Sequence, residues 1–323
     1  MARKGDRSPK VIQGDKKHAW SLGTLHVGFL TWLRDRNYAE ATIHQRRRHL
    51  NDLIVWAEER SITRPTELTR HMLERYQRHL ATRPSARTNK PASYRQQFLQ
   101  LCSVRAWFRY LLRQQQILHN PAAELELPKL GSPLPRHILT ASQADDVLRQ
   151  TDLLSPLGLR DRAILETFYS TGIRRAELVH LHVYDVDVER GVLAIRQGKG
   201  RKDRMVPIGR RALAWLEKYR QESRPRLLVR DTETALFLTR FGTAFSVSSM
   251  STLVSRYVAS AELGVTGSCH LFRHALATSM LDHDADTRFI QAMLGHASLS
   301  TTQIYTRVSV AKLKEVHDRT HPS

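Results

Sequence analysis

The chain has 323 residues, of which 51 are Lys or Arg and 31 are Asp or Glu, so its formal net charge at pH 7 is 51 − 31 = +20. This basic balance predicts a polyanionic partner, most simply nucleic acid. The two cysteines, Cys102 and Cys269, cannot build a disulfide framework or a zinc site with four cysteine ligands. No apolar run approaches the roughly 20 residues that a membrane span needs.

The N-terminal stretch MARKGDRSPKVIQGDKK is charged and lacks the apolar segment of a secretory signal. We therefore expect a soluble protein of the cytoplasm with no membrane partner. Residues 1–20 are predicted to form a basic, disordered arm.

Residues 21–119 show apolar side chains at three- and four-residue steps, which predicts four helices and no strand. Thr69 is a predicted helix cap, and the three arginines at 46–48 are expected to point outward. The segment is thus predicted to be a small all-α bundle. Its expected inward positions are Leu22, Leu25, Phe29 and Leu33; Leu50, Ile54 and Ala57; Leu73, Tyr76 and Leu80; and Phe98, Leu101, Phe108 and Leu112.

Residues 120–140, NPAAELELPKLGSPLPRHILT, contain four prolines and a glycine, a composition that resists regular structure. We predict a linker there and a second domain over residues 141–323 that ends in a C-terminal tail. Helical patterns are expected around 210–220, 246–262, 270–282, 287–294 and 310–318.

The second domain has one clear strand signal. VLAIR (192–196) and RMVPI (204–208) are β-rich runs joined by QGKGRKD, so a hairpin is predicted with Lys199 near its tip. The fold class expected for the whole chain is mainly α, with a small antiparallel sheet in the second domain.

The segment HLFRH (270–274) places His270 and Arg273 on one helix face. The spacing of His270 and His274 is that of a zinc-protease helix. That chemistry needs Glu after the first histidine, and the residue here is Leu271. The pattern alone also fits two ordinary surface histidines.

The segment TGIRRAEL (171–178) breaks an apolar helix at Gly172 and begins a new one. Arg174 falls in its first turn, where a positive charge opposes the helix dipole. Such an arginine is either simply solvated or held for an anion.

The segment LGHASLSTTQIYTR (294–307) contains His296 and Tyr305 around a run of small polar residues. Together with the arginines, the lysine and His270, these are the components of a metal-free phosphodiester exchange. Arginine can hold phosphate oxygens, Lys or His can protonate a leaving alkoxide, and a tyrosine can attack phosphorus.

These segments, in this order and followed by KLKEVHDRTHP, resemble the tyrosine recombinase (phage integrase) family, most closely its bacterial Xer branch. The resemblance covers about residues 140–321 and leaves His180, His182 and His274 without a reactive role. The N-terminal bundle is similar to the core-binding (SAM-like) domain of the family. The positions that match the reactive residues of the family are Arg174, Lys199, His270, Arg273, His296 and the nucleophile Tyr305.

The resemblance implies a site-specific recombinase that needs no cofactor and joins DNA through a 3′-phosphotyrosyl intermediate and a Holliday junction. It also implies a tetramer on two double-stranded DNA sites, made of one chain or shared with a related recombinase and an accessory DNA-binding protein, at a bacterial nucleoid. Its role is either to resolve dimers or cointegrates or to integrate and excise a mobile element. Two alternatives are a type IB topoisomerase and a non-catalytic DNA-binding protein.

Overall fold

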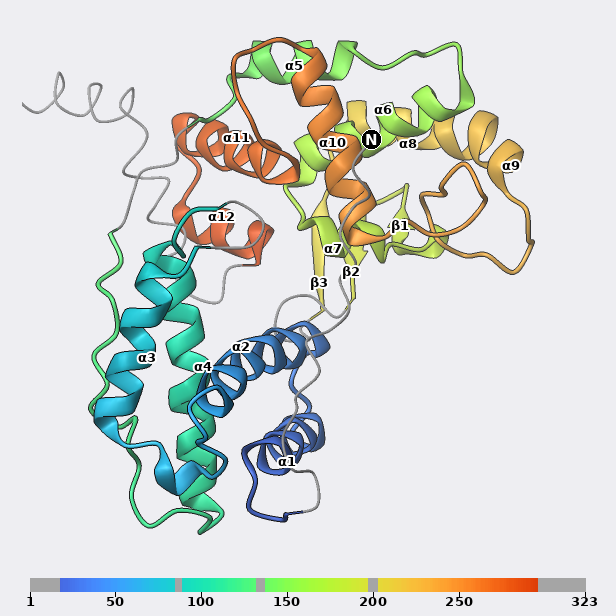
Figure 1. Cartoon of the computed structure of the whole chain (residues 1–323). Coiled ribbons are helices and arrows are strands. Elements are labelled where there is room, and N and C mark those ends of the chain that lie inside the picture. Colours follow the sequence, from blue (N-terminus) through green and yellow to red (C-terminus); the bar gives the residue numbers. More distant parts are fainter. Residues whose placement is uncertain (1–17, 85–88, 132–136, 197–202, 296–323) are drawn as a thin grey trace, which may run out of the picture. The chain divides into compact units, whose positions relative to one another are not determined.

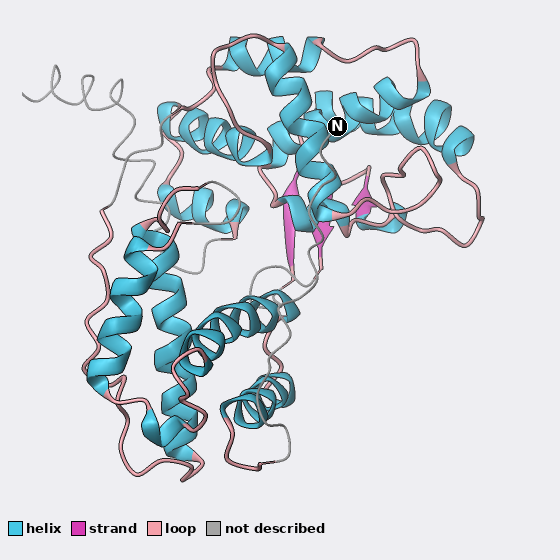
Figure 2. Ribbon diagram, in the orientation of Figure 1, coloured by secondary structure: helices cyan, strands magenta, loops and turns pink. Residues whose placement is uncertain are grey.

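The computed structural model describes residues 18–84, 89–131, 137–196 and 203–295, and the chain divides into two compact units, residues 1–132 and 133–323. Figure 1 shows the elements in chain order and Figure 2 shows that helices dominate both units. The prediction of a mainly helical chain is therefore confirmed. Most of the arm predicted for residues 1–20 lies outside the described residues.

The first unit is the predicted helical bundle. Side-chain oxygens begin three of its helices: Ser21 accepts from the backbone N–H of Thr24, Thr69 from Met72, and Ser93 from Gln96. The cap expected at Thr69 is thus confirmed. The helices are α1 (Leu22–Asp35), α2 (Glu40–Glu58), α3 (Arg70–Thr82) and α4 (Tyr94–Arg113), with a 3-10 turn at Pro65–Glu67.

The core of this unit lies where α2 and α4 pack against each other and against α1 and α3. Most of the positions that the helical spacing predicted to face inward belong to this core. Leu112 is an exception, because it is 39% exposed while its neighbour Leu111 is fully buried. Leu25 and Phe98 are only half-buried, whereas Arg46 lies 5.3 Å from the ring of Tyr38 instead of pointing freely outward.

The packing of the first unit continues past α4 into the segment predicted as a linker. Ala122 and Leu125 have almost no exposed surface and belong to the bundle core. No helix or strand forms over 120–131, as the proline content predicts. The segment therefore lacks regular structure but packs against the bundle through its apolar side chains.

The second unit is built around α6 (Pro156–Thr171), which packs against α8 (Arg210–Lys218) and α11 (Cys269–Asp282). A π-helical turn at Tyr219–Ser223 joins α8 to α9 (Arg224–Leu227). Helices were predicted over 210–220, 246–262, 270–282 and 287–294 and are found there, while 310–318 lies outside the described residues. The helices are α5 (Ala141–Arg149), α6 (Pro156–Thr171), α7 (Arg175–Val179), α8 (Arg210–Lys218), α9 (Arg224–Leu227), α10 (Val247–Ser260), α11 (Cys269–Asp282) and α12 (Thr287–Leu294).

The sheet of the second unit has three antiparallel strands in the order β1 (Val186–Asp187), β2 (Val192–Ile195) and β3 (Arg204–Pro207). Residue Ile195 faces Arg204 across the β2–β3 pair, so the predicted hairpin is confirmed. Figure 2 shows the strands in magenta. Strand β1 follows a 3-10 turn at Val183–Asp185 and was not predicted.

Helix α6 is buried on nearly all sides, so the charges that it carries are paired. The guanidinium of Arg160 donates to Asp161 at 2.7 Å. The carboxylate of Glu166 is only 1% exposed and accepts from Arg162 at 3.0 Å and from Arg211 at 2.9 Å. Among the described residues, no helix is both long enough and apolar enough to cross a bilayer.

Candidate active site

The turn between α6 and α7 is made possible by Gly172. Its φ is +58°, and a Cβ at this position would lie 2.8 Å from Leu276 and 2.9 Å from Leu294. Only glycine meets both conditions without strain. The turn ends α6, and the predicted new helix begins at Arg175, so Arg174 lies at the position just before α7 and not within its first turn as expected.

The positive charge of Arg174 at a helix N-terminus is compensated by Glu177, three residues further along. The carboxylate of Glu177 accepts from the backbone N–H of Arg174 at 2.8 Å and from its Nη1 at 2.9 Å. The other terminal nitrogen of Arg174, Nη2, donates to the carbonyl of Gly295 at 2.7 Å. The guanidinium is therefore held on two sides while its side chain remains 21% exposed.

Glu177 is also bound by an arginine from the sheet. Arg204, the first residue of β3, donates its two terminal nitrogens to the two carboxylate oxygens of Glu177 at 3.0 and 2.8 Å. Burial raises the pKa of Glu177, but the hydrogen bonds from Arg204 and Arg174 outweigh it, and the pKa lies below its ordinary value. The carboxylate is thus charged and shared by two guanidinium groups.

Arg273 projects from α11 and is only 4% exposed. Its Nη1 donates to the carbonyl of Gly172 at 2.8 Å, and its Nη2 donates to that of Leu294 at 2.7 Å. Arg273 therefore connects the glycine turn before Arg174 with the end of α12. The structure brings the two predicted arginines to one place in this way.

The C-terminal end of α12 is where these arginines meet. The last carbonyls of a helix have no intrahelical partner and carry a partial negative charge. Here three consecutive carbonyls each accept a hydrogen bond from a different arginine. The pairs are Arg204 with Met293, at the long distance of 3.5 Å, Arg273 with Leu294, and Arg174 with Gly295.

His270 lies in the first turn of α11, one turn before His274, and the centroids of the two rings are 6.5 Å apart. The residue has an exposed edge, yet the protein around the imidazole lowers its pKa by desolvation, and the charges of Arg273, Arg175 and Arg174 lower it further. The ring is consequently neutral at pH 7. A neutral imidazole can accept a proton.

Three predicted site residues, Lys199, His296 and Tyr305, lie outside the described residues. The structure does not describe residues 197–202, between Arg196 and Asp203, and its description ends at Gly295. His296 is therefore the residue that follows the arginine-bound end of α12, and Lys199 belongs to the interval that joins β2 to β3.

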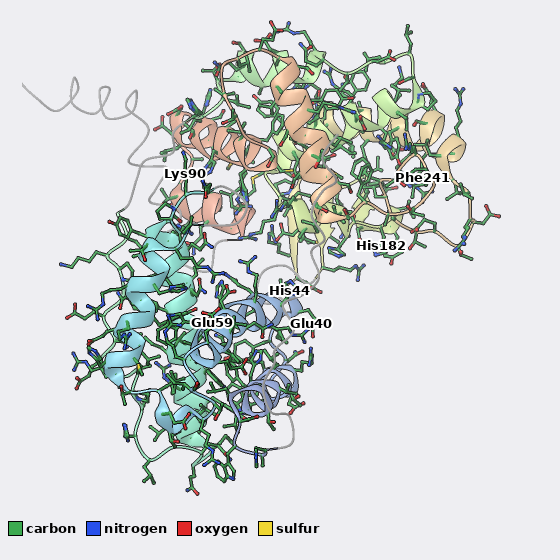
Figure 3. The ribbon with its side chains drawn as sticks, in the orientation of Figure 1. Glu40, His44, Glu59, Lys90, His182 and Phe241 are labelled. Carbon is green, nitrogen blue, oxygen red and sulfur yellow. The ribbon has the colours of Figure 1, made fainter. Side chains whose placement is uncertain are left out.

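Histidines without a predicted reactive role make local contacts. His182, labelled in Figure 3, stacks on Tyr184 with ring centroids 5.1 Å apart, and its Nδ1 lies 2.9 Å from the hydroxyl of Thr234. His180 Nδ1 lies 2.6 Å from the carbonyl of Ala176. Where the chain is described, no group of three or more His, Cys, Asp and Glu side chains is arranged to hold a metal ion.

The sequence reasoning missed Glu177 and Arg204. Glu177 carried a signal, because a carboxylate three residues after a helix cap is the reciprocal half of a capping box. Arg204 carried none, since its partner is 27 residues away and the pairing depends on how α7 meets β3.

A model of the phage integrase family matches residues 137–312, more than half of the chain. Tyrosine recombinase XerC 2 of Ralstonia nicotianae is 48% identical over 288 residues, which cover 88% of this chain and 82% of the relative. Tyrosine recombinase XerD of Pseudomonas aeruginosa is 40% identical over 222 residues, 69% of this chain and 74% of the relative. The crystal structure of the XerH recombinase bound to palindromic difH substrate aligns with a TM-score of 0.71 at 20% identity, over 92% of this chain and 84% of that one.

The chain therefore belongs to the phage integrase family and is a tyrosine recombinase, an enzyme that acts on DNA. Within that family it is a site-specific recombinase of the Xer type. The resemblance inferred from its sequence motifs is thereby confirmed.

Proposed function

We propose that this recombinase cuts each DNA strand by attack of Tyr305 on the scissile phosphate. The attack would form a 3′-phosphotyrosyl bond and release a 5′-hydroxyl. Because the ester conserves the energy of the phosphodiester, a second strand can displace the tyrosine without ATP. Two such exchanges, with a Holliday junction between them, would recombine two sites.

The observation that carries this proposal is the convergence of Arg174 and Arg273 on adjacent carbonyls at the end of α12. A guanidinium has five N–H donors in a fixed plane, and two of them can hold the non-bridging oxygens of a phosphate. Contacts that fix the guanidinium groups before DNA binds reduce the reorganisation needed at the moment of reaction. The two arginines would then stabilise the additional negative charge of the pentacoordinate transition state.

The remaining site residues would move protons or add a hydrogen bond. His270, neutral at pH 7, would accept the phenolic proton of Tyr305. Lys199 would protonate the departing 5′ oxygen, and His296 would donate a hydrogen bond to the phosphate. No metal ion is assigned a step in this scheme.

The working assembly would be a tetramer on two double-stranded DNA sites in the bacterial cytoplasm. A related recombinase can supply half of the subunits, and an accessory DNA-binding protein can order the complex. The DNA sequence that is bound determines whether the reaction resolves dimers or cointegrates or moves a mobile element. Sequencing the footprint of the protein on the DNA of its own host distinguishes these roles.

The test is a suicide DNA substrate with a nick that prevents religation. The wild-type chain should become covalently attached to DNA, and Tyr305→Phe should bind the same site without attachment. Tyr184→Phe is the matched control, because Tyr184 is 61% exposed in the same unit and has no assigned role. A covalent complex with Tyr305→Phe would refute the nucleophile, and loss of wild-type attachment in excess chelator would refute the metal-free scheme.

A further inference from the structure

Arg204 joins three parts of the second unit. It begins β3, its terminal nitrogens bind both oxygens of Glu177 on α7, and its Nε lies 3.5 Å from the carbonyl of Met293 on α12. Its side chain is only 16% exposed, so the guanidinium is fixed among these partners. It is a third arginine beside the two predicted for the phosphate.

The end of α12 is shaped to receive this side chain. Gly295 has a φ of +62°, and a Cβ there would lie 2.9 Å from both Cζ and Nε of Arg204. The guanidinium therefore lies directly against the backbone from which the chain continues to His296. A Cβ at position 295 would therefore force the guanidinium of Arg204 to move.

Arg204 also determines how Arg174 is held. The Oε1 atom of Glu177 accepts from Arg174 at 2.9 Å and from Arg204 at 3.0 Å, so the two guanidinium groups share one carboxylate oxygen. Without Arg204, the full charge of Glu177 would act on Arg174 alone. The carboxylate would also lose the bidentate partner that fixes its plane.

We infer that Arg204 is a positioning residue for strand cleavage, which links the hairpin that carries Lys199 to Arg174 and to the end of α12. This inference rests on the proposed roles of Arg174 and Tyr305. Arg204 acts on the phosphate through Glu177 and Arg174, without touching it. Its contribution is geometric, and a displacement of about 1 Å in such a site costs roughly 10²-fold in rate.

The experiment compares Arg204→Gln with Arg211→Gln in the full chain. Arg211 is a suitable control because it also binds two carboxylates in the same unit, those of Glu166 on α6 and Asp145 on α5, and neither of them contacts Arg174. On the nicked suicide substrate, Arg204→Gln should lower the single-turnover cleavage rate by about 10²-fold. Affinity for the DNA site should change little, and Arg211→Gln should cleave within a few-fold of wild type.

A double-mutant cycle separates positioning from loss of structure. In an Arg174→Ala background, Arg204→Gln should lower the remaining rate by less than about threefold, because the group that it positions is already absent. Arg204→Lys keeps the charge but not the planar fork, so it should recover about tenfold of the lost rate. A thermal melt checks the fold of each variant. If Arg204→Gln does not fold, the cleavage rates of Arg204→Lys and Arg211→Lys are compared instead.

Equal cleavage defects in the Arg204 and Arg211 variants, or full multiplication of the Arg204 and Arg174 effects, would overturn the inference. Failure of the proposed function has a different signature, since the wild-type chain would then form no covalent complex. The wild-type measurement comes first and decides between the two.

Discussion

A histidine that is neutral at pH 7 can accept a proton, whereas the same ring in acid cannot. His270 has its pKa lowered by desolvation and by three nearby arginines, which places its protonation below the ordinary value of 6.5. The arginines that would hold the phosphate thus also prepare the neighbouring base. At the scale of one residue, this positive charge adds to desolvation in lowering the pKa of the imidazole.

We expect the acidic limb of the cleavage rate to report this ring. As pH falls through the lowered pKa of His270, the imidazole becomes charged and the rate should decline, with its midpoint below 6.5. His270→Gln should lower the rate at pH 7 by about 10²-fold and flatten this limb. Single-turnover cleavage from pH 5 to 8 measures it, and His180→Gln is the matched control, because His180 lies in the same unit at the end of α7 and has no assigned role.

A midpoint above 6.5 in the wild-type chain would contradict the assignment. An unchanged acidic limb in His270→Gln would also contradict it, because a group other than His270 would then accept the proton.

At the scale of secondary-structure elements, the contact of α1 with α4 contains a buried histidine. His26 is 1% exposed, its ring lies 6.3 Å edge-on from that of Trp107, and neither ring nitrogen hydrogen-bonds to a described residue. Burial and the charge of Arg47 lower its pKa to about 4. The helices therefore pack around a neutral imidazole.

We expect this packing to weaken in acid. The folded pKa lies below the unfolded value of 6.5, so between these values the unfolded chain binds the proton and the folded chain does not. The difference of about 2.5 pKa units corresponds to roughly 3 kcal/mol of unfolding free energy, present above pH 6.5 and lost as pH falls toward 4. His26→Leu should remove most of this slope.

Tryptophan fluorescence during urea unfolding measures the effect. Trp215→Phe removes the one tryptophan of the second unit, so the remaining signal reports the first unit. His44→Leu is the control, because His44 is an exposed residue of α2 (Figure 3). The same pH slope in His26→Leu as in the parent chain would show that another group controls acid stability.

The sequence predicted elements well where apolar residues recur at regular spacing and poorly where they do not. Phe29, Leu50 and Phe108 fall on long apolar faces and are buried as expected. Leu111 and Leu112 are adjacent, and which of them faces inward depends on the roll of α4, which spacing alone did not fix. Strand β1 has two residues, too few to show an alternation.

The candidate site shows the same division. Arg174 and Arg273 lie in recognisable motifs, and in the structure they donate to adjacent carbonyls at the end of α12. The pairing of Arg204 with Glu177 depends on how β3 meets α7, and no local pattern encodes such a contact. The positions of Lys199, His296 and Tyr305 remain predictions.

At the scale of the whole molecule, the +20 charge is the dominant property. Binding to DNA should release condensed counterions, so the logarithm of the affinity should fall linearly with the logarithm of salt concentration. For about 6–10 phosphate contacts, the affinity should drop roughly 10³–10⁵-fold between 50 and 200 mM salt.

Fluorescence anisotropy on a labelled site at several salt concentrations measures this slope. Arg48 is exposed on α2, and Arg48→Gln should reduce the slope by about one if this face contacts a phosphate. Arg149→Gln is the control, because Arg149 is paired with Asp146 at 2.6 Å. An affinity that barely changes with salt would refute a phosphate-dominated interface.

The three arginines at the end of α12 limit how segments can be exchanged between recombinases of this type to make chimeric enzymes. A chimera that takes the segment after Leu294 from another enzyme also changes the backbone that follows the helix end. Arg174, Arg204 and Arg273 come from three separate stretches of the recipient and contact the carbonyls of the original helix end. Grafts that exchange α12 together with these three partners should retain activity more often than grafts cut at Gly295.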